Sequence, residues 1–206
     1  MNVVISVGGS RLFKGTELDI KFLEELKELV GKRKERFYLV VGGGWVARKF
    51  QGYGRRLGLD DVQLDLIGIA ATRLNAELVR NFLGLKTPVL TNPLDVKHKE
   101  KVLVFSGWKP GFSTDYVAVR LAKEVGSDKV INVSKVGYIY KEGRKVREIS
   151  WDEAGKMAGE WRPGLNFPVD PMACKYGKEL KFYLVRETED LENVLDGKPF
   201  RGTLIR

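Results

Sequence analysis

The sequence predicts an α/β protein with a three-layer α/β/α architecture, in which a mostly parallel sheet lies between helices. Two observations support this prediction. Short apolar runs alternate with amphipathic helical patterns along the whole chain, as in proteins built from strands and crossover helices. Three of the apolar runs end in glycine-containing loops, at 8–10, 42–44 and 107–111. Glycine at the end of a strand lets backbone N–H groups approach an anion closely, and a following helix N-terminus adds positive charge.

The first half of the chain contains strand and helix patterns in turn. The strand patterns lie at residues 3–7, 36–41, 88–90 and 101–105. The helix patterns cover residues 16–31, a stretch that begins near Gly44, residues 60–82 and residues 113–125. Thr16 and Gly31 are residue types that cap helix N- and C-termini, so they set the expected ends of the first helix. The helix at 60–82 is apolar nearly all round, so we expect it in a core or at a subunit interface.

The second half continues this alternation. Its strand patterns lie at residues 128–133, 182–185 and 203–205, with a hairpin at 136–149 that turns at 141–144. Its helices are expected to open at Ser150 and Pro171 and to cover residues 189–195. The composition shifts near residue 126, without a linker-like segment. We therefore expect residues 1–206 to form a single domain, with one lobe at 1–125 and a second at 126–206.

The composition limits the class of function. The net charge is +9, but the basic residues are interleaved with acidic ones, which is typical of a solvated surface and does not predict a nucleic-acid partner. No apolar run approaches the ~20 residues that span a membrane. Cys174 is the only cysteine, so an internal disulfide and a cysteine-based zinc cluster are excluded, and the cytoplasm is the expected location. The high content of Lys, Arg and Glu is typical of thermophilic proteins.

Several enzyme classes lack their motifs here. None of the glycine loops contains the Gly-Lys-Ser/Thr of a Walker A sequence. Residues 42–47 fit the Gly-x-Gly-x-x-Gly/Ala pattern, but without the acidic residue that follows in dinucleotide-binding folds. His98 is the only histidine and lies in the charged run 97–101, so no Ser-His-Asp or Cys-His group is expected. Transfer of a phosphoryl group to a phosphate monoester needs no such base, because the second pKa of the acceptor is about 6.

Polar residues beside the glycine loops are candidates for an anion site. Arg48 lies one helical turn after Gly44, so its guanidinium can return toward an anion there; a surface arginine is the alternative. Asp65 is a charged residue inside the apolar helix, where a ligand hydroxyl or an ion partner is expected. The stretch 109–115 offers a cation, two hydroxyls, a carboxylate and an aromatic ring, although Ser113 also fits as a helix N-cap.

Six stretches of the chain resemble a known family, and they occur in the family's order. They are 7–10, 41–44 with 47–48, 65–76, 110–115, 169–173 with Lys175, and 202–203. These stretches are similar to the amino acid kinase superfamily and, within it, to the archaeal uridylate (UMP) kinases, for which 65–76 is the specific stretch. The resemblance implies transfer of the ATP γ-phosphate to UMP, giving UDP, with Mg²⁺ bound together with ATP and no separate metal site.

The resemblance also implies roles for individual residues. The expected catalytic residues are Ser10, Arg48 and Asp115. The expected ATP-binding residues are Gly8, Gly9, Ser10, Gly44, Arg48, Ser134 and Tyr140. The expected UMP-binding residues are Gly43, Asp65 on the ribose, and the acceptor loop of Lys109, Pro110, Gly111, Phe112, Ser113, Thr114 and Asp115. Residues 1–125 then form the acceptor and phosphate lobe, and 126–206 the nucleotide-donor lobe. Family members are typically hexamers built from dimers that pack the long helix.

Two other functions remain open at this point. One is a kinase of another small phosphomonoester, such as isopentenyl phosphate, although enzymes of that type carry a histidine where this chain has Trp45 and Val46. The other is a nucleotide-binding sensor or storage protein without catalysis. It is favoured by residues 136–140, which read Val-Gly-Tyr-Ile-Tyr where the family reads Val-Asp-Gly-Val-Tyr.

Overall fold

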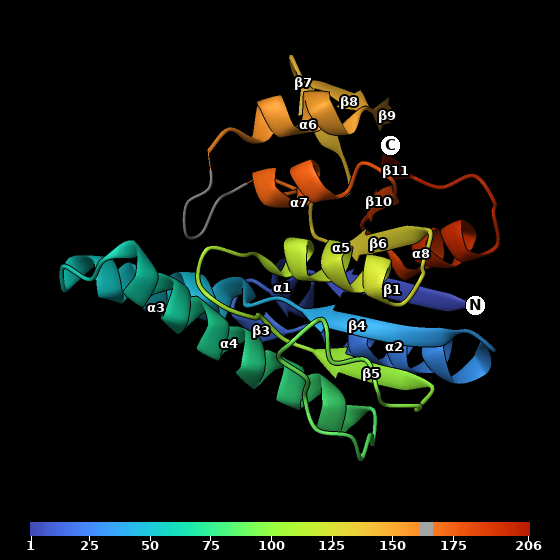
Figure 1. Ribbon diagram of the computed structural model, residues 1–206, viewed down its shortest axis with the longest axis horizontal. Helices are drawn as coiled ribbons and strands as arrows, with labels where there is room; N and C mark the ends of the chain where they lie inside the picture. Colours follow the sequence, from blue (N-terminus) through green and yellow to red (C-terminus); the bar gives the residue numbers. More distant parts are fainter. Residues whose placement is uncertain (161–166) are drawn as a thin grey trace.

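Seven strands form one sheet in the computed structural model, which describes residues 1–160 and 167–206 (Figure 1). From edge to edge the strands are β5 (Val102–Phe105), β4 (Arg36–Val41), β1 (Asn2–Val7), β6 (Lys129–Val133), β10 (Lys181–Val185), β11 (Gly202–Ile205) and β9 (Glu148–Ile149). Neighbouring strands run parallel, except for β10 and β11. The mostly parallel sheet is therefore confirmed, and the carboxyl ends of the parallel strands lie at one edge, where ligands bind in such folds.

Helices cover both faces of the sheet, as the three-layer prediction requires. One face carries α5 (Thr114–Glu124), α6 (Trp151–Ala158) and α7 (Pro171–Tyr176). The other face carries α2 (Ile20–Lys32), the second half of α4 (Asp61–Phe82) and α8 (Thr188–Leu195). Side chains alternate between the two faces along each strand. In β1, Val4 belongs to the core with α5, whereas Val3 and Ile5 belong to the core with α2.

The helices α3 (Gly44–Arg56) and α4 pack along each other and project beyond the sheet (Figure 1). The start of α4 agrees with the prediction, and its exposed side leaves the predicted alternative of a subunit interface open. Leu64 and Val79 are buried, whereas Leu66 and Leu74 are 53% and 63% exposed. Within this chain α4 is therefore buried on one side only, and an apolar stripe remains on the other.

The first long helix begins and ends later than predicted. Residues 13–18 form a small hairpin, and Thr16 lies in its turn. Asp19 is the N-cap of α2 instead, because its buried carboxylate accepts a hydrogen bond from the N–H of Phe22 at 3.2 Å. At the other end the helix continues through Gly31. The expected capping roles of Thr16 and Gly31 are therefore wrong.

Five short elements complete the described chain. They are α1 (Gly9–Leu12), β2 (Phe13–Lys14), β3 (Glu17–Leu18), β7 (Ile139–Lys141) and β8 (Arg144–Val146). β7 and β8 form the predicted hairpin, and its turn contains Glu142 and Gly143 with φ angles of 51° and 76°. The predicted strand at 88–90 is reduced to a single bridge between Leu90 and Phe105.

Helix starts in the second half follow the sequence signals. Ser150 accepts a hydrogen bond from the N–H of Glu153 and caps α6, as predicted. Pro171 opens α7, and Asp170 before it is the N-cap. None of the helices in residues 1–160 and 167–206 is both long and apolar enough to cross a membrane.

Candidate active site

The loops that follow β1 and β4 touch backbone to backbone. A β-carbon placed on Gly9 would lie 2.1 Å from the nitrogen of Gly44, and one placed on Gly44 would lie 2.2 Å from the carbonyl oxygen of Gly9. Gly44 also has a φ of 58°, which residues with a β-carbon rarely adopt. The N–H of Gly42 donates to the carbonyl oxygen of Val7 at 2.9 Å. The two loops therefore form one continuous glycine surface at the carboxyl edge of the sheet.

Helix α4 holds the second and third glycine loops in place. Asn75 donates through Nδ2 to the carbonyl oxygens of Gly42 and Gly43, at 2.8 and 3.0 Å. One turn earlier, Oγ1 of Thr72 accepts a hydrogen bond from the N–H of Gly107 at 2.8 Å. Asn75 and Thr72 are both buried, so these bonds satisfy backbone groups that water does not reach. One face of one helix therefore positions two of the three loops.

Asp115 lies at the start of α5 near a second carboxylate, Asp170. The hydroxyl of Ser6 and the amide of Asn132 both donate to Oδ1 of Asp115, at 2.9 and 2.8 Å. Burial, with a smaller contribution from the charge of Asp170, raises the pKa of Asp115 to about 7. Burial also raises the pKa of Asp170. This acid pair therefore takes up a proton near neutral pH unless a cation neutralises it.

Asp170 connects α5 to α7. Its Oδ1 accepts hydrogen bonds from the N–H groups of Met172 and Ala173, at 2.7 and 2.9 Å, and so caps α7. Its Oδ2 accepts a hydrogen bond from the hydroxyl of Ser113. Ser113 in turn caps α5 by accepting from the N–H of Asp115 at 3.1 Å, which agrees with the N-cap alternative. The starts of the two helices therefore meet at the acid pair.

The glycine loops, α3, α4 and the start of α5 surround a cavity of about 240 Å³. Predicted site residues line it from both the donor and the acceptor side: Gly9, Ser10, Gly43, Gly44, Arg48, Asp65, Phe112, Ser113, Thr114 and Asp115. Asp170 lines the same cavity. The fold thus gathers an arginine, three carboxylates and a glycine surface around one space.

The acceptor loop reaches this cavity only with its second half. Oδ2 of Asp65 accepts a hydrogen bond from the N–H of Gly111 at 2.7 Å, which ties the loop to α4. Lys109 is exposed, and its Nζ lies over the ring of Trp108, 4.1 Å from the ring centroid. Lys109, Pro110 and Gly111 are therefore not among the residues that line the cavity.

The donor side is less closely assembled. Oγ of Ser10 lies 3.5 Å from Oγ of Ser134, and the N–H of Lys135 donates to Ser10 at 3.3 Å. These contacts join the segment after β6 to the first glycine loop. Tyr140 lies on β7 and is exposed. Gly8, Ser134 and Tyr140 do not line the cavity, whereas Gly9, Ser10, Gly44 and Arg48, which were predicted to bind ATP, do.

Several buried polar residues of the site carried no predicted role, among them Ser6, Asn132 and Asp170. Ser6 and Asn132 interrupt apolar strand runs, and a polar residue within a buried strand is a signal that the sequence does carry. Among the described residues, Oδ1 of Asn132 is the buried side-chain atom without a hydrogen-bond partner. An unpaired buried amide oxygen costs stability, so its presence next to Asp115 indicates a requirement of the site.

The two conventional reactive side chains lie elsewhere. Cys174 is buried in α7, and burial raises the pKa of its thiol to about 12, so it is a poor nucleophile. His98 lies in the segment before β5 and does not line the cavity. Glycine N–H groups and Arg48 instead suit an anionic ligand whose charge is redistributed during reaction.

Comparison with known proteins agrees with this chemistry. A model of the amino acid kinase family matches residues 1–181. The chain belongs to the amino acid kinase family. Its relatives include a uridylate kinase of Methanosarcina barkeri, 33% identical over 216 residues that cover 95% of this chain and 92% of the relative. Another is a uridylate kinase of Haloquadratum walsbyi, 37% identical over 192 residues that cover 85% and 79%.

This amino acid kinase is also similar to solved structures of uridylate kinases. The crystal structure of uridylate kinase from Archaeoglobus fulgidus matches it with a TM-score of 0.80 and 28% identity, over 100% of both chains. UMP kinase from Ureaplasma parvum, at 21% identity and a TM-score of 0.76, shares the fold. The family and the fold expected from the glycine loops and from residues 65–76 are therefore confirmed.

Replacing Asp115 with Asn is expected to stabilise the nucleotide-free kinase by more at pH 8 than at pH 5. Asn keeps an oxygen for Ser6 and Asn132 but carries no charge. In the wild type the pKa rises from 3.8 to about 7 on folding, so the free energy of unfolding falls as pH rises across that range. Each unit of the raised pKa corresponds to about 1.4 kcal/mol. Urea unfolding at both pH values measures the difference.

The surface change Asp128→Asn serves as the control, because Asp128 is exposed. It is expected to show no difference between the two pH values. An equal effect of Asp115→Asn at pH 5 and pH 8 would contradict the raised pKa.

Proposed function

We propose that this amino acid kinase transfers the γ-phosphate of ATP to UMP and releases UDP and ADP. The observation that carries the proposal is the single cavity in which Ser10, Gly44 and Arg48 lie together with Asp65 and the start of α5. The uridylate kinases among its relatives support the same reaction.

The phosphates of ATP would lie along the glycine surface of the first two loops. Gly9 and Gly44 have no side chains to block the approach of an anion to their backbone. Gly8 would support this loop, because its N–H already donates to the carbonyl oxygen of Val133 at 2.9 Å. Ser10 adds a hydroxyl, and the planar guanidinium of Arg48 can bind two phosphate oxygens at once. Ser134 and Tyr140 would hold the nucleoside end of ATP. In this assignment residues 126–206 form the donor lobe and residues 1–125 the acceptor and phosphate lobe.

UMP would lie between Gly43 and the acceptor loop 109–115. The carboxylate of Asp65 already accepts a hydrogen bond from Gly111. Because a carboxylate offers about four acceptor sites, it can also accept a ribose hydroxyl. The acceptor phosphate would then face the start of α5, where Thr114 lines the cavity and the helix dipole favours negative charge.

The transfer needs no general base from the protein. An oxygen of the UMP phosphate bonds to the γ-phosphorus, the bond from that phosphorus to the bridging oxygen breaks, and the electron pair leaves with ADP. With a second pKa of about 6, the attacking phosphate is already a dianion at neutral pH. Arg48 and the glycine N–H groups would stabilise the charge on the transferred group. The carboxylate of Asp115 would lie beside the reacting phosphates, and the hydroxyl of Ser6 would hold it there by donating a hydrogen bond.

The described residues fit a Mg²⁺ ion that enters with ATP. Asp115 and Asp170 offer the oxygen ligands that Mg²⁺ prefers, and the unpartnered oxygen of Asn132 belongs to the amide that contacts Asp115. No group of three or more His, Cys, Asp or Glu residues in the described part could hold a metal, so phosphate oxygens and water would complete the coordination. When bound, the ion would neutralise charge on the phosphates. The two aspartates would then be ionised.

We also propose that the apolar stripe of α4 joins two copies of the chain, within a hexamer of the family's type. Val62, Leu66, Leu74 and Leu78 on this helix are all large, apolar and at least 42% exposed. An exposed apolar patch of this kind marks a protein contact in a soluble chain.

Turnover with single acceptors tests the reaction. With ATP and Mg²⁺, we expect UMP to raise ADP release above the background without acceptor. Other nucleoside monophosphates and isopentenyl phosphate are expected to do so much less. If ADP is released only with a non-nucleotide phosphomonoester, that compound and not UMP is the acceptor. Nucleotide binding with no ADP release above background would instead indicate a sensor or storage protein.

The change Asp65→Asn is expected to raise the KM for UMP by about 10- to 100-fold, because a hydrogen bond to a charged group contributes about 1.5–3 kcal/mol. The KM for ATP should stay unchanged. Steady-state kinetics with each substrate varied in turn measures both values. Asp61→Asn, at an exposed position in the first turn of the same helix, is the matched control. An unchanged KM for UMP would rule out the ribose contact.

The change Leu74→Glu is expected to lower the molar mass of the assembly, because an unpaired carboxylate buried in an interface is costly. Light scattering after size-exclusion chromatography measures the mass. Ile20→Glu is the control: Ile20 is 59% exposed but lies on α2, away from the stripe. If the Leu74 variant keeps the molar mass of the wild type, the contact between copies does not involve the apolar stripe of α4.

A further inference from the structure

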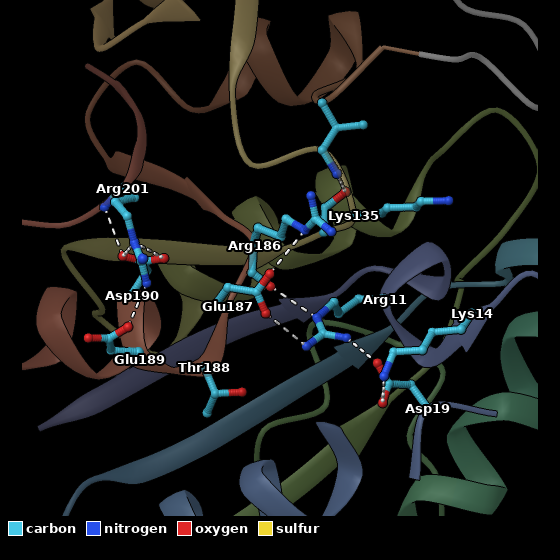
Figure 2. A network of polar contacts seen from close by, with 12 residues as sticks. Arg11, Lys14, Asp19, Lys135, Arg186, Glu187, Thr188, Glu189, Asp190 and Arg201 are labelled. Carbon is cyan, nitrogen blue, oxygen red and sulfur yellow. Dashed lines mark hydrogen bonds and ion pairs between the residues drawn. The ribbon is translucent and has the colours of Figure 1, made fainter. Parts of the chain in front are cut away.

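Arg11 follows Ser10 in the first loop, and its guanidinium lies between the starts of α2 and α8 (Figure 2). Nη1 is ion-paired with Asp19, the N-cap of α2. Nη2 lies 3.3 Å from Oε2 of Glu187, the residue before α8, and Nε donates to the carbonyl oxygen of Arg186 at 3.0 Å. The guanidinium also stands over the ring of Phe22, 4.4 Å from its centroid. One side chain thus joins two helices that are far apart in sequence.

The contact with α2 is the buried one, because Glu187 on the side of α8 is 45% exposed. The side chain of Arg11 is 13% exposed and that of Asp19 is 2% exposed. Burial acts to raise the pKa of Asp19, but hydrogen bonds from Lys14, Phe22 and Arg11 outweigh it and hold the pKa below its usual value. Loss of Arg11 would leave the buried carboxylate of Asp19 with Lys14, 3.0 Å away, and the N–H of Phe22 as its partners. Part of the compensation for its burial would therefore be lost.

Arg11 directly follows the donor loop 8–10 and lies in α1. The N–H of Arg11 donates to the carbonyl oxygen of Gly8 at 2.7 Å. Ser10, immediately before it, contacts Ser134, whose N–H donates to the carbonyl oxygen of Val185 at 2.9 Å. Val185 is the last residue of β10 and Arg186 follows it. The contacts of Ser10, through Ser134, and of Arg11 therefore both lead to the end of β10. A movement of Arg11 would therefore move Ser10 relative to Gly44.

We propose that Arg11 is a positioning residue for donor binding: by clamping the starts of α2 and α8, it fixes Ser10 and Gly9 against Gly44. This inference rests on the proposed role of Gly9 and Ser10 in binding ATP phosphates. The guanidinium of Arg11 points toward Asp19 and Glu187 (Figure 2), and Arg11 is not among the residues that line the cavity. Its loss acts on ATP and leaves UMP binding intact.

The opposite ends of the same two helices provide a matched control. Arg33 is the C-cap of α2 and pairs with Asp196, the C-cap of α8, at 2.8 Å. Arg33 also pairs with Glu35 at 2.8 Å. This second arginine therefore makes the same type of connection between α2 and α8, but at the ends of the helices that lie away from the glycine loops. A purely structural role would make the two arginines equivalent.

The experiment compares Arg11→Ala with Arg33→Ala by thermal unfolding, by calorimetric titration with a non-hydrolysable ATP analogue and Mg²⁺, and by titration with UMP. Both variants are expected to lower Tm. Only Arg11→Ala is expected to weaken binding of the ATP analogue, by about tenfold or more, a change of 1.4 kcal/mol or more. Arg11→Lys should restore part of the affinity, because an ammonium keeps the positive charge but cannot bond Asp19, Glu187 and the carbonyl oxygen of Arg186 at the same time.

Equal analogue affinity in the two alanine variants would overturn the inference. If Arg11→Ala does not fold, the milder pair Glu187→Gln and Asp196→Asn gives the same comparison at the two helix ends. The binding readout separates this inference from the proposed reaction. If the wild type does not phosphorylate UMP but Arg11→Ala still weakens binding of the ATP analogue, the role of Arg11 is supported and UMP is rejected as the acceptor. A wild type that does not bind the analogue rejects both.

Discussion

The contact between Gly9 and Gly44 is the constraint on which the rest of the site depends. The two residues follow the neighbouring parallel strands β1 and β4, and any β-carbon on either would push the loops apart. The approach brings two sets of backbone N–H groups together without side chains between them. Asn75 then holds the second loop from α4. The position of α4, including the apolar stripe that it presents, therefore follows from the geometry of the glycine surface.

The site also contains groups that oppose folding. Asp115 and Asp170 are close enough for their charges to interact, and burial raises the pKa of both. The amide oxygen of Asn132 has no partner among residues 1–160 and 167–206. Such groups reduce the stability of the protein without ligand, and a bound cation with phosphates would relieve both defects. Asp115, Asp170 and Asn132 are unfavourably buried without ligand, and their oxygen atoms suit a cation bound together with phosphates.

The sequence predicted the sheet and the glycine loops because strand periodicity and glycine positions are local signals. It failed at Thr16, whose type suits a cap, because the true cap, Asp19, depends on partners brought by tertiary structure. It left open whether the apolar surface of α4 lies in a core or at a subunit interface, because composition does not distinguish the two. Asp170 stood before a proline, the usual sign of a helix start, but its approach to Asp115 requires α7 to pack near α5, which no local pattern contains.

Asp19 both explains why the start of α2 was wrongly predicted and forms the buried ion pair with Arg11. It begins α2, and it also fixes Arg11, which follows the donor loop. A helix that began at Thr16 would satisfy local capping rules but would leave Arg11 without its buried anion. The later start allows the small hairpin of β2 and β3 to form and places a carboxylate under the loop. The position of this helix end therefore follows from the contacts of Asp19 with Phe22 and Arg11 and not from the propensity of the residues around it.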